Sequence, residues 1–96
     1  MDRENIIDVI KKYKHETRYK NNIIKIGIFG SVAKNEFTGS SDVDVFVELK
    51  KPKMFDLIGI KQELEILLNK HVDIIMLRNR MNRFLKEHIE QEGIYV

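Results

Sequence analysis

Two aspartates separated by one residue, Asp42 and Asp44, are the first feature of the sequence that could do chemistry. They alternate with valines over residues 42–48, a pattern typical of a strand, which would put both carboxylates on one face. Two ionised carboxylates this close repel each other, and divalent cations are the usual remedy where catalysis is needed. Oxygen donors favour Mg²⁺ or Mn²⁺ over zinc. Taken alone, however, an Asp-x-Asp tripeptide is more often a turn cap beside a solvent-facing strand residue.

A third carboxylate, Asp73, changes that balance. It lies in the apolar run Val72-Asp73-Ile74-Ile75, which predicts a separate strand. An unpaired charge among core-forming residues is costly, and a shared metal cluster would explain its presence.

The pair Gly30-Ser31 directly follows a predicted strand at residues 23–29. Backbone N–H groups and a serine hydroxyl at such a turn could hold phosphate oxygens, and glycine allows close approach. The pair is not a Walker A loop, because the Gly-Lys-Ser/Thr ending is absent. By itself it would indicate only a turn, so its interest depends on its spacing to the aspartates.

Helices and strands that alternate along the chain must position these residues. We expect a small mixed sheet of three to four strands covered by helices, in the α/β or α+β class, forming one domain over residues 1–96. We expect a first helix over about 3–20 and strands at 23–29, 42–48 and 71–77. A second helix would carry the apolar residues Leu57, Ile60, Leu64 and Leu67. Asn79 could cap a last helix, which would end at Gly93 and carry Met81, Phe84, Leu85, His88 and Ile89.

Composition excludes several classes of function. With no cysteine among 96 residues, disulfide frameworks, thiolate zinc sites and cysteine nucleophiles are ruled out. The N-terminus lacks a signal-peptide core, and no apolar run approaches the roughly 20 residues that span a bilayer, so we expect a cytoplasmic protein without membrane contact. The net charge is only +2. We therefore interpret the lysine clusters as solvated surface and do not expect direct nucleic-acid binding.

Three histidines, His15, His71 and His88, show no metal-ligand spacing of their own, and we interpret them as ordinary surface or strand residues.

The stretch Gly30-Ser31-Val32-Ala33-Lys34-Asn35-Glu36, then Ser41-Asp42-Val43-Asp44-Val45 and Asp73, resembles the signature of the DNA polymerase β-type nucleotidyltransferase superfamily, in particular its minimal (MNT) branch. The resemblance implies that Asp42 and Asp44 bind two Mg²⁺ ions and that Asp73 completes the site and helps to deprotonate the attacking hydroxyl. Gly30 and Ser31 would hold the triphosphate of ATP, with Lys34 and Ser41 as further candidate contacts. Many relatives have arginine and glycine where this chain has Lys34 and Asn35, and we treat Asn35 as sequence drift.

Proteins similar to this one are commonly paired with HEPN-domain ribonuclease toxins. The resemblance therefore implies an antitoxin that forms a hetero-oligomer with such a toxin and transfers AMP from ATP to a tyrosine hydroxyl on it. Two alternatives stay open: an antitoxin that neutralises its partner by binding alone, and a nucleotidyltransferase for a small molecule.

Overall fold

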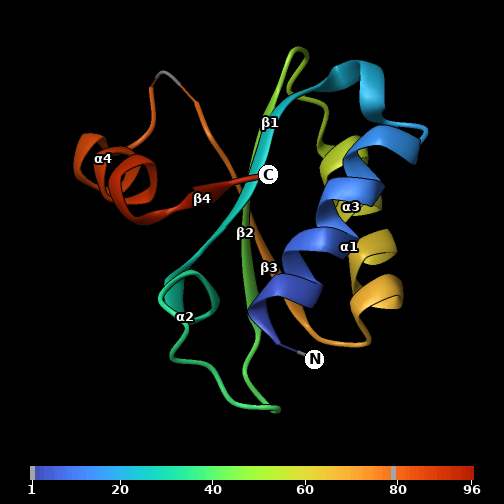
Figure 1. Cartoon of the computed structure of the whole chain (residues 1–96). Helices are drawn as coiled ribbons and strands as arrows, with labels where there is room; N and C mark the ends of the chain where they lie inside the picture. The colour runs from blue at the N-terminus through green and yellow to red at the C-terminus, as the bar shows by residue number, and fades with distance from the viewer. Residues whose placement is uncertain (1, 79) are drawn as a thin grey trace.

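The computed structural model describes residues 2–78 and 80–96 and contains one four-stranded sheet with helices on both faces (Figure 1). The elements follow in the order α1 (Arg3–Glu16), a 3₁₀ turn (Lys20–Asn22), β1 (Ile23–Phe29), α2 (Gly30–Ala33), β2 (Val43–Leu49), α3 (Met54–Leu68), β3 (Val72–Met76), α4 (Arg83–Glu92) and β4 (Ile94–Tyr95). The strand order is β3-β2-β1-β4, with β2 and β3 parallel and the other two pairs antiparallel. The sheet is therefore mixed, which confirms the predicted fold class.

Strand β2 separates the two sides of the core. Its alternating Val43, Val45 and Val47 are fully buried in the larger apolar cluster, to which α1 and α3 also contribute. On the other face Phe46 packs in a smaller cluster with Ile89 of α4. Figure 1 shows the same division, with α1 and α3 together on one side of the sheet and α4 on the other. Asp44 alternates with these valines, so it shares its face with Phe46.

The first helix is shorter than predicted. It ends at Glu16, because Thr17 has an extended backbone and its N–H donates to the Tyr13 carbonyl. The 3₁₀ turn then carries the chain into β1. Charged residues continue the amphipathic pattern past this point, so periodicity alone could not locate the end of the helix.

The last helix begins later than predicted. Its N-cap is Asn82, whose side chain accepts hydrogen bonds from the N–H groups of Phe84 and Leu85. Met81 consequently precedes the helix instead of forming part of its stripe, while Asn79, the predicted cap, lies outside the described residues. After Gly93 the chain forms β4, which pairs with β1. Among the described helices, none has both the length and the apolar character that a bilayer span demands.

Candidate metal and nucleotide site

The parallel pairing of β2 and β3 brings the aspartates of two strands to one place on the sheet. Asp44 and Asp73 are direct register partners, and Asp42 lies just before β2. The Val43 N–H donates to the His71 carbonyl at 2.9 Å, which also fixes the entrances of the two strands beside each other. Val43 and Val72 are fully buried on the face that α1 and α3 cover, so the aspartates that flank them point to the opposite face.

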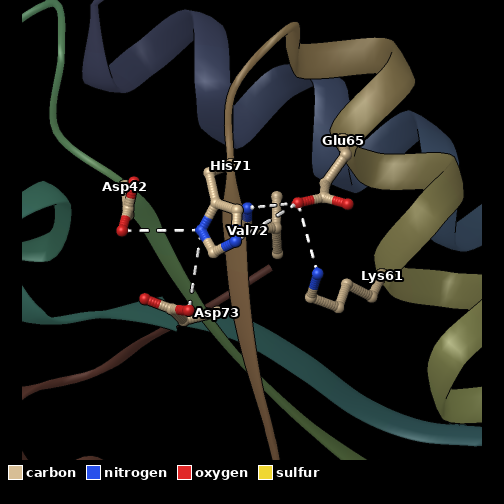
Figure 2. Close-up of polar contacts among 6 residues, drawn as sticks. All are labelled: Asp42, Lys61, Glu65, His71, Val72 and Asp73. Carbon is tan, nitrogen blue, oxygen red and sulfur yellow. Dashed lines mark hydrogen bonds and ion pairs between the residues drawn. The ribbon is translucent and has the colours of Figure 1, made fainter.

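Asp42, His71 and Asp73 form a compact group of donor atoms (Figure 2). One donor atom from each lies within 4.8 Å of the others. His71 Nδ1 is 3.5 Å from Asp42 Oδ2 and 3.7 Å from Asp73 Oδ1. All three side chains are about half exposed, with 57% exposure for His71, so solvent and ligands can reach them. Asp44 does not belong to this group.

Asp44 lies deeper and faces Gly30. Burial raises the pKa of its carboxyl, and the negative charges of Asp73 and Asp42 raise this pKa further. A Cβ atom placed on Gly30 would overlap the Asp44 carboxylate, and Gly30 also has a φ of +69°, in the left-handed region. Glycine is therefore required here both by backbone conformation and by the close approach of Asp44.

Of the four residues predicted to contact the nucleotide, Gly30 and Ser31 lie next to Asp44, whereas Lys34 and Ser41 contact other residues. Gly30 and Ser31 open α2 directly after β1, next to Asp44. Lys34 Nζ instead pairs with Glu92 Oε2 of α4 at 3.3 Å. The Ser41 hydroxyl accepts the Thr38 N–H at 2.9 Å and so belongs to the loop before β2. In this conformation Lys34 is paired with a residue of α4, and Ser41 contacts its own loop.

Asn35 does more than the sequence interpretation allowed. It has a φ of +59° directly after the cap of α2, and its N–H donates to the Val32 carbonyl. Asparagine is the residue other than glycine that most readily takes this left-handed conformation at a helix end. Asn35 thus ends α2, and treating it as drift overlooked this role.

His71 is the site residue that sequence reasoning missed. A signal was available, since His71-x-Asp73 repeats on one strand the spacing that Asp42-x-Asp44 has on its neighbour. Residues two apart at a strand share a face, which put the imidazole beside the carboxylates.

On the side of His71 away from the aspartates lies the carboxylate of Glu65 in α3, which is held by two interactions. Its Oε2 accepts the Val72 N–H at 3.0 Å and lies 3.3 Å from Lys61 Nζ. The Val72 hydrogen bond is the main reason that the pKa of Glu65 is lowered. The same oxygen is 3.9 Å from His71 Nε2, so the imidazole lies between Glu65 and the two aspartates (Figure 2).

The donor set fits a divalent cation. Three carboxylates lie close enough together that the charges of Asp42 and Asp73 raise the pKa of Asp44. A bound cation would remove that repulsion and favour the ionised form. Carboxylate oxygens are the ligands that Mg²⁺ and Mn²⁺ usually take in proteins. Asp42, Asp44 and Asp73 are thus suited to hold such ions beside the Gly30 turn.

Comparison with known sequences places this geometry in a wider context. Residues 4–96 match the family described as "Polymerase beta, Nucleotidyltransferase". A Methanocaldococcus jannaschii protein named "Putative protein adenylyltransferase MJ0126" is 35% identical over 92 residues, which cover 95% of this chain and 94% of the relative. The protein adenylyltransferase MntA of Thermococcus cleftensis is 30% identical over 94 residues, covering 97% of this chain and 94% of the relative.

Solved structures share the fold. One described as a "putative minimal nucleotidyltransferase" superposes with a TM-score of 0.76 at 28% identity, covering 98% of this chain and 95% of its own. A toxin-antitoxin structure with AMP-PNP has a TM-score of 0.73 at 22% identity, with coverage of 95% and 71%. A tri-AMPylated Shewanella oneidensis HEPN toxin in complex with MNT antitoxin has a TM-score of 0.66 at 21% identity, with coverage of 99% and 71%. At these lower identities, the last two likenesses concern the fold alone.

Proposed function

Because this chain belongs to the polymerase beta nucleotidyltransferase family, we propose that it is a metal-dependent antitoxin that transfers AMP from ATP to a tyrosine hydroxyl of a HEPN-domain toxin. One observation carries the catalytic part of this proposal: Asp44 and Asp73 are in register on parallel strands, with Asp42 at the strand entrance and the Gly30 turn against Asp44. The proposal treats residues 1–96 as one minimal domain.

Related proteins support the choice of substrate and partner. Relatives at 30% and 35% identity carry the name protein adenylyltransferase, which favours AMP as the group transferred and a protein as acceptor. The neighbours in fold include a complex with AMP-PNP and an AMPylated HEPN toxin bound to an MNT antitoxin. These properties belong to those proteins, and we extend them to this chain as a hypothesis.

In the proposed reaction the acceptor hydroxyl oxygen attacks the α-phosphorus of ATP, and the bond from that phosphorus to the bridging oxygen of the β-phosphate breaks. Pyrophosphate leaves with that oxygen, while the hydroxyl loses its proton. Two divalent cations held by Asp42, Asp44 and Asp73 would neutralise the attacking and leaving oxygens. No covalent intermediate with the protein is needed.

The chain's own residues have distinct tasks in this scheme. Asp42, Asp44 and Asp73 supply the carboxylates of the metal centre. Asp73 is the more exposed partner of the Asp44–Asp73 pair, so it is the better placed of these two to accept the hydroxyl proton. Gly30 and Ser31 present backbone N–H groups and a hydroxyl for the triphosphate.

Lys34 and Ser41 belong to the proposed nucleotide contacts only if their present interactions change. Lys34 would have to release Glu92, whereas the Ser41 hydroxyl accepts the Thr38 N–H and would have to turn its own O–H toward a phosphate oxygen. Both existing interactions are at exposed or half-exposed positions, where exchange for a phosphate costs little.

Co-expression with the product of the neighbouring gene tests the proposal. Intact-protein mass spectrometry should detect added AMP on the partner, and peptide mapping should assign it to a tyrosine. Asp42→Asn and Asp44→Asn should abolish the added mass while the partner still co-purifies. Asp8→Asn, which changes an exposed aspartate of α1, is the matched control and should label the partner normally. A partner that is silenced without ever gaining AMP would support the binding-only antitoxin instead.

A further inference from the structure

His71 adds a donor of a different kind to the carboxylates of the site. Its Nδ1 faces Asp42 Oδ2 at 3.5 Å and Asp73 Oδ1 at 3.7 Å, and all three side chains are open to solvent (Figure 2). Two donors bound to one ion at about 2.1 Å lie about 3.0–3.4 Å apart for octahedral to tetrahedral angles. The two separations from Nδ1 are slightly longer than this range, and the donor atoms of Asp42 and Asp73 lie within 4.8 Å of each other. Side-chain rotations at these exposed positions can close the differences.

The opposite edge of the imidazole is also suitably placed. Its Nε2 faces Glu65, whose carboxylate is anchored by the Val72 N–H and by Lys61. At 3.9 Å this contact is too long for a hydrogen bond, but the Glu65 anion faces the Nε2 edge of the ring. With a cation bound at Nδ1, the imidazole proton would lie on Nε2 and point toward this carboxylate. Metal-binding histidines are commonly oriented in this way by a carboxylate behind them.

We infer that His71 is a ligand of the metal centre and that, together with Asp42 and Asp73, it makes one cation position prefer Mn²⁺, Co²⁺ or Zn²⁺ over Mg²⁺. The inference rests on the proposed function, because it uses two of the same aspartates. Imidazole nitrogen binds these transition metals well and Mg²⁺ poorly, whereas carboxylates alone suit Mg²⁺. Asp44 lies outside the nitrogen-containing group, so a second position can remain all-oxygen.

Electron spin-echo spectroscopy of bound Mn²⁺ tests the inference without relying on activity. The whole chain would be loaded with Mn²⁺ and inorganic tripolyphosphate, which contains no nitrogen, in a nitrogen-free buffer. A directly bound imidazole should produce ¹⁴N modulation in the wild type, and His71→Gln should remove it. His15→Gln, which changes an exposed histidine of α1, should retain the modulation. Because His71 is 57% exposed, unchanged thermal unfolding should accompany its substitution.

Calorimetry with Co²⁺ and Mg²⁺ provides the second measurement. His71→Gln should lower the affinity for Co²⁺ about ten-fold or more and leave that for Mg²⁺ within about two-fold. Mn²⁺ bound by the wild type without ¹⁴N modulation would overturn the role of His71 and leave the aspartate site intact. Failure of the wild type to bind any divalent cation, with or without tripolyphosphate, would overturn both this inference and the proposed function.

Discussion

Substituting alanine for Gly30 tests the link between backbone geometry and the carboxylates. Gly30 has a φ of +69°, and an L-residue in the left-handed region costs about 1–2 kcal/mol. For a domain of this length, about 1 kcal/mol shifts the unfolding midpoint by roughly 4–8 °C, so Gly30→Ala should lower it by about 5–15 °C. The new methyl group would also overlap the Asp44 carboxylate and push it aside. A displacement of about 1 Å can cost about 100-fold in rate.

Gly39→Ala is the matched control, because a Cβ atom at Gly39 meets nothing within 4 Å and Gly39 is not among the glycines with positive φ. Thermal unfolding by circular dichroism gives the midpoint. The rate of AMP transfer to the partner should then be measured at a temperature where both variants are folded. We expect Gly39→Ala to match the wild type in both assays. A Gly30→Ala protein with wild-type transfer would refute the proposed placement of Asp44, even if its midpoint were lower.

Three further predictions have independent outcomes. Asp44 has a raised pKa, so the folded metal-free protein holds this proton more tightly than the unfolded chain and should gain stability as the pH falls below neutral. Asp44→Asn should remove most of this pH dependence. In EDTA it should raise the thermal unfolding midpoint by roughly 2–4 °C, since solvent screens the repulsion between Asp44 and the neighbouring aspartates to about 0.5 kcal/mol. In thermal scans with Mg²⁺, Asp44→Asn should abolish the stabilisation by the metal. Burial raises the pKa of Tyr13, whose hydroxyl donates to Glu63 at 2.7 Å, so the wild type should lose stability as the pH rises above about 10. In urea titrations, the stability of Tyr13→Phe should depend less on pH in this range. At neutral pH, Tyr13→Phe should be about 1 kcal/mol less stable than the wild type, because it lacks this hydrogen bond. Glu92→Gln should free Lys34 and tighten ATP binding about two-fold, measured by calorimetry, whereas Lys34→Ala should weaken ATP binding. Equal affinities for ATP in the wild type and both variants would show that Lys34 does not contact the nucleotide.

The strands could be predicted because their signals are local. The alternating valines of β2 gave both the strand and the face that carries Asp44, and Asp73 within an apolar run marked the neighbouring strand. Side-chain alternation has a period of two, so a correct strand assignment also assigns the faces. The short β1 run ending before Gly30 fixed the turn in the same way.

The remaining features depend on contacts between distant segments or on backbone torsions. The contacts of His71 with Asp42 depend on the parallel register of β2 and β3, and the ion pair of Lys34 with Glu92 depends on where α4 packs. The end of α1 at Glu16 and the N-cap at Asn82 depend on one or two local hydrogen bonds within an otherwise continuous polar pattern. Asparagine at position 35 is compatible with the left-handed conformation, but the residue type alone does not show that α2 ends there.

Transfer of label from ATP tests the central claim most directly. The purified chain and its partner would be incubated with divalent metal and ATP that carries radioactive phosphorus either at the α- or at the γ-position. The account predicts that only α-label enters the partner, that EDTA stops it, and that Asp73→Asn removes it while Asp8→Asn does not. Incorporation of γ-label, or α-label transfer that survives Asp42→Asn and Asp44→Asn together, would contradict it.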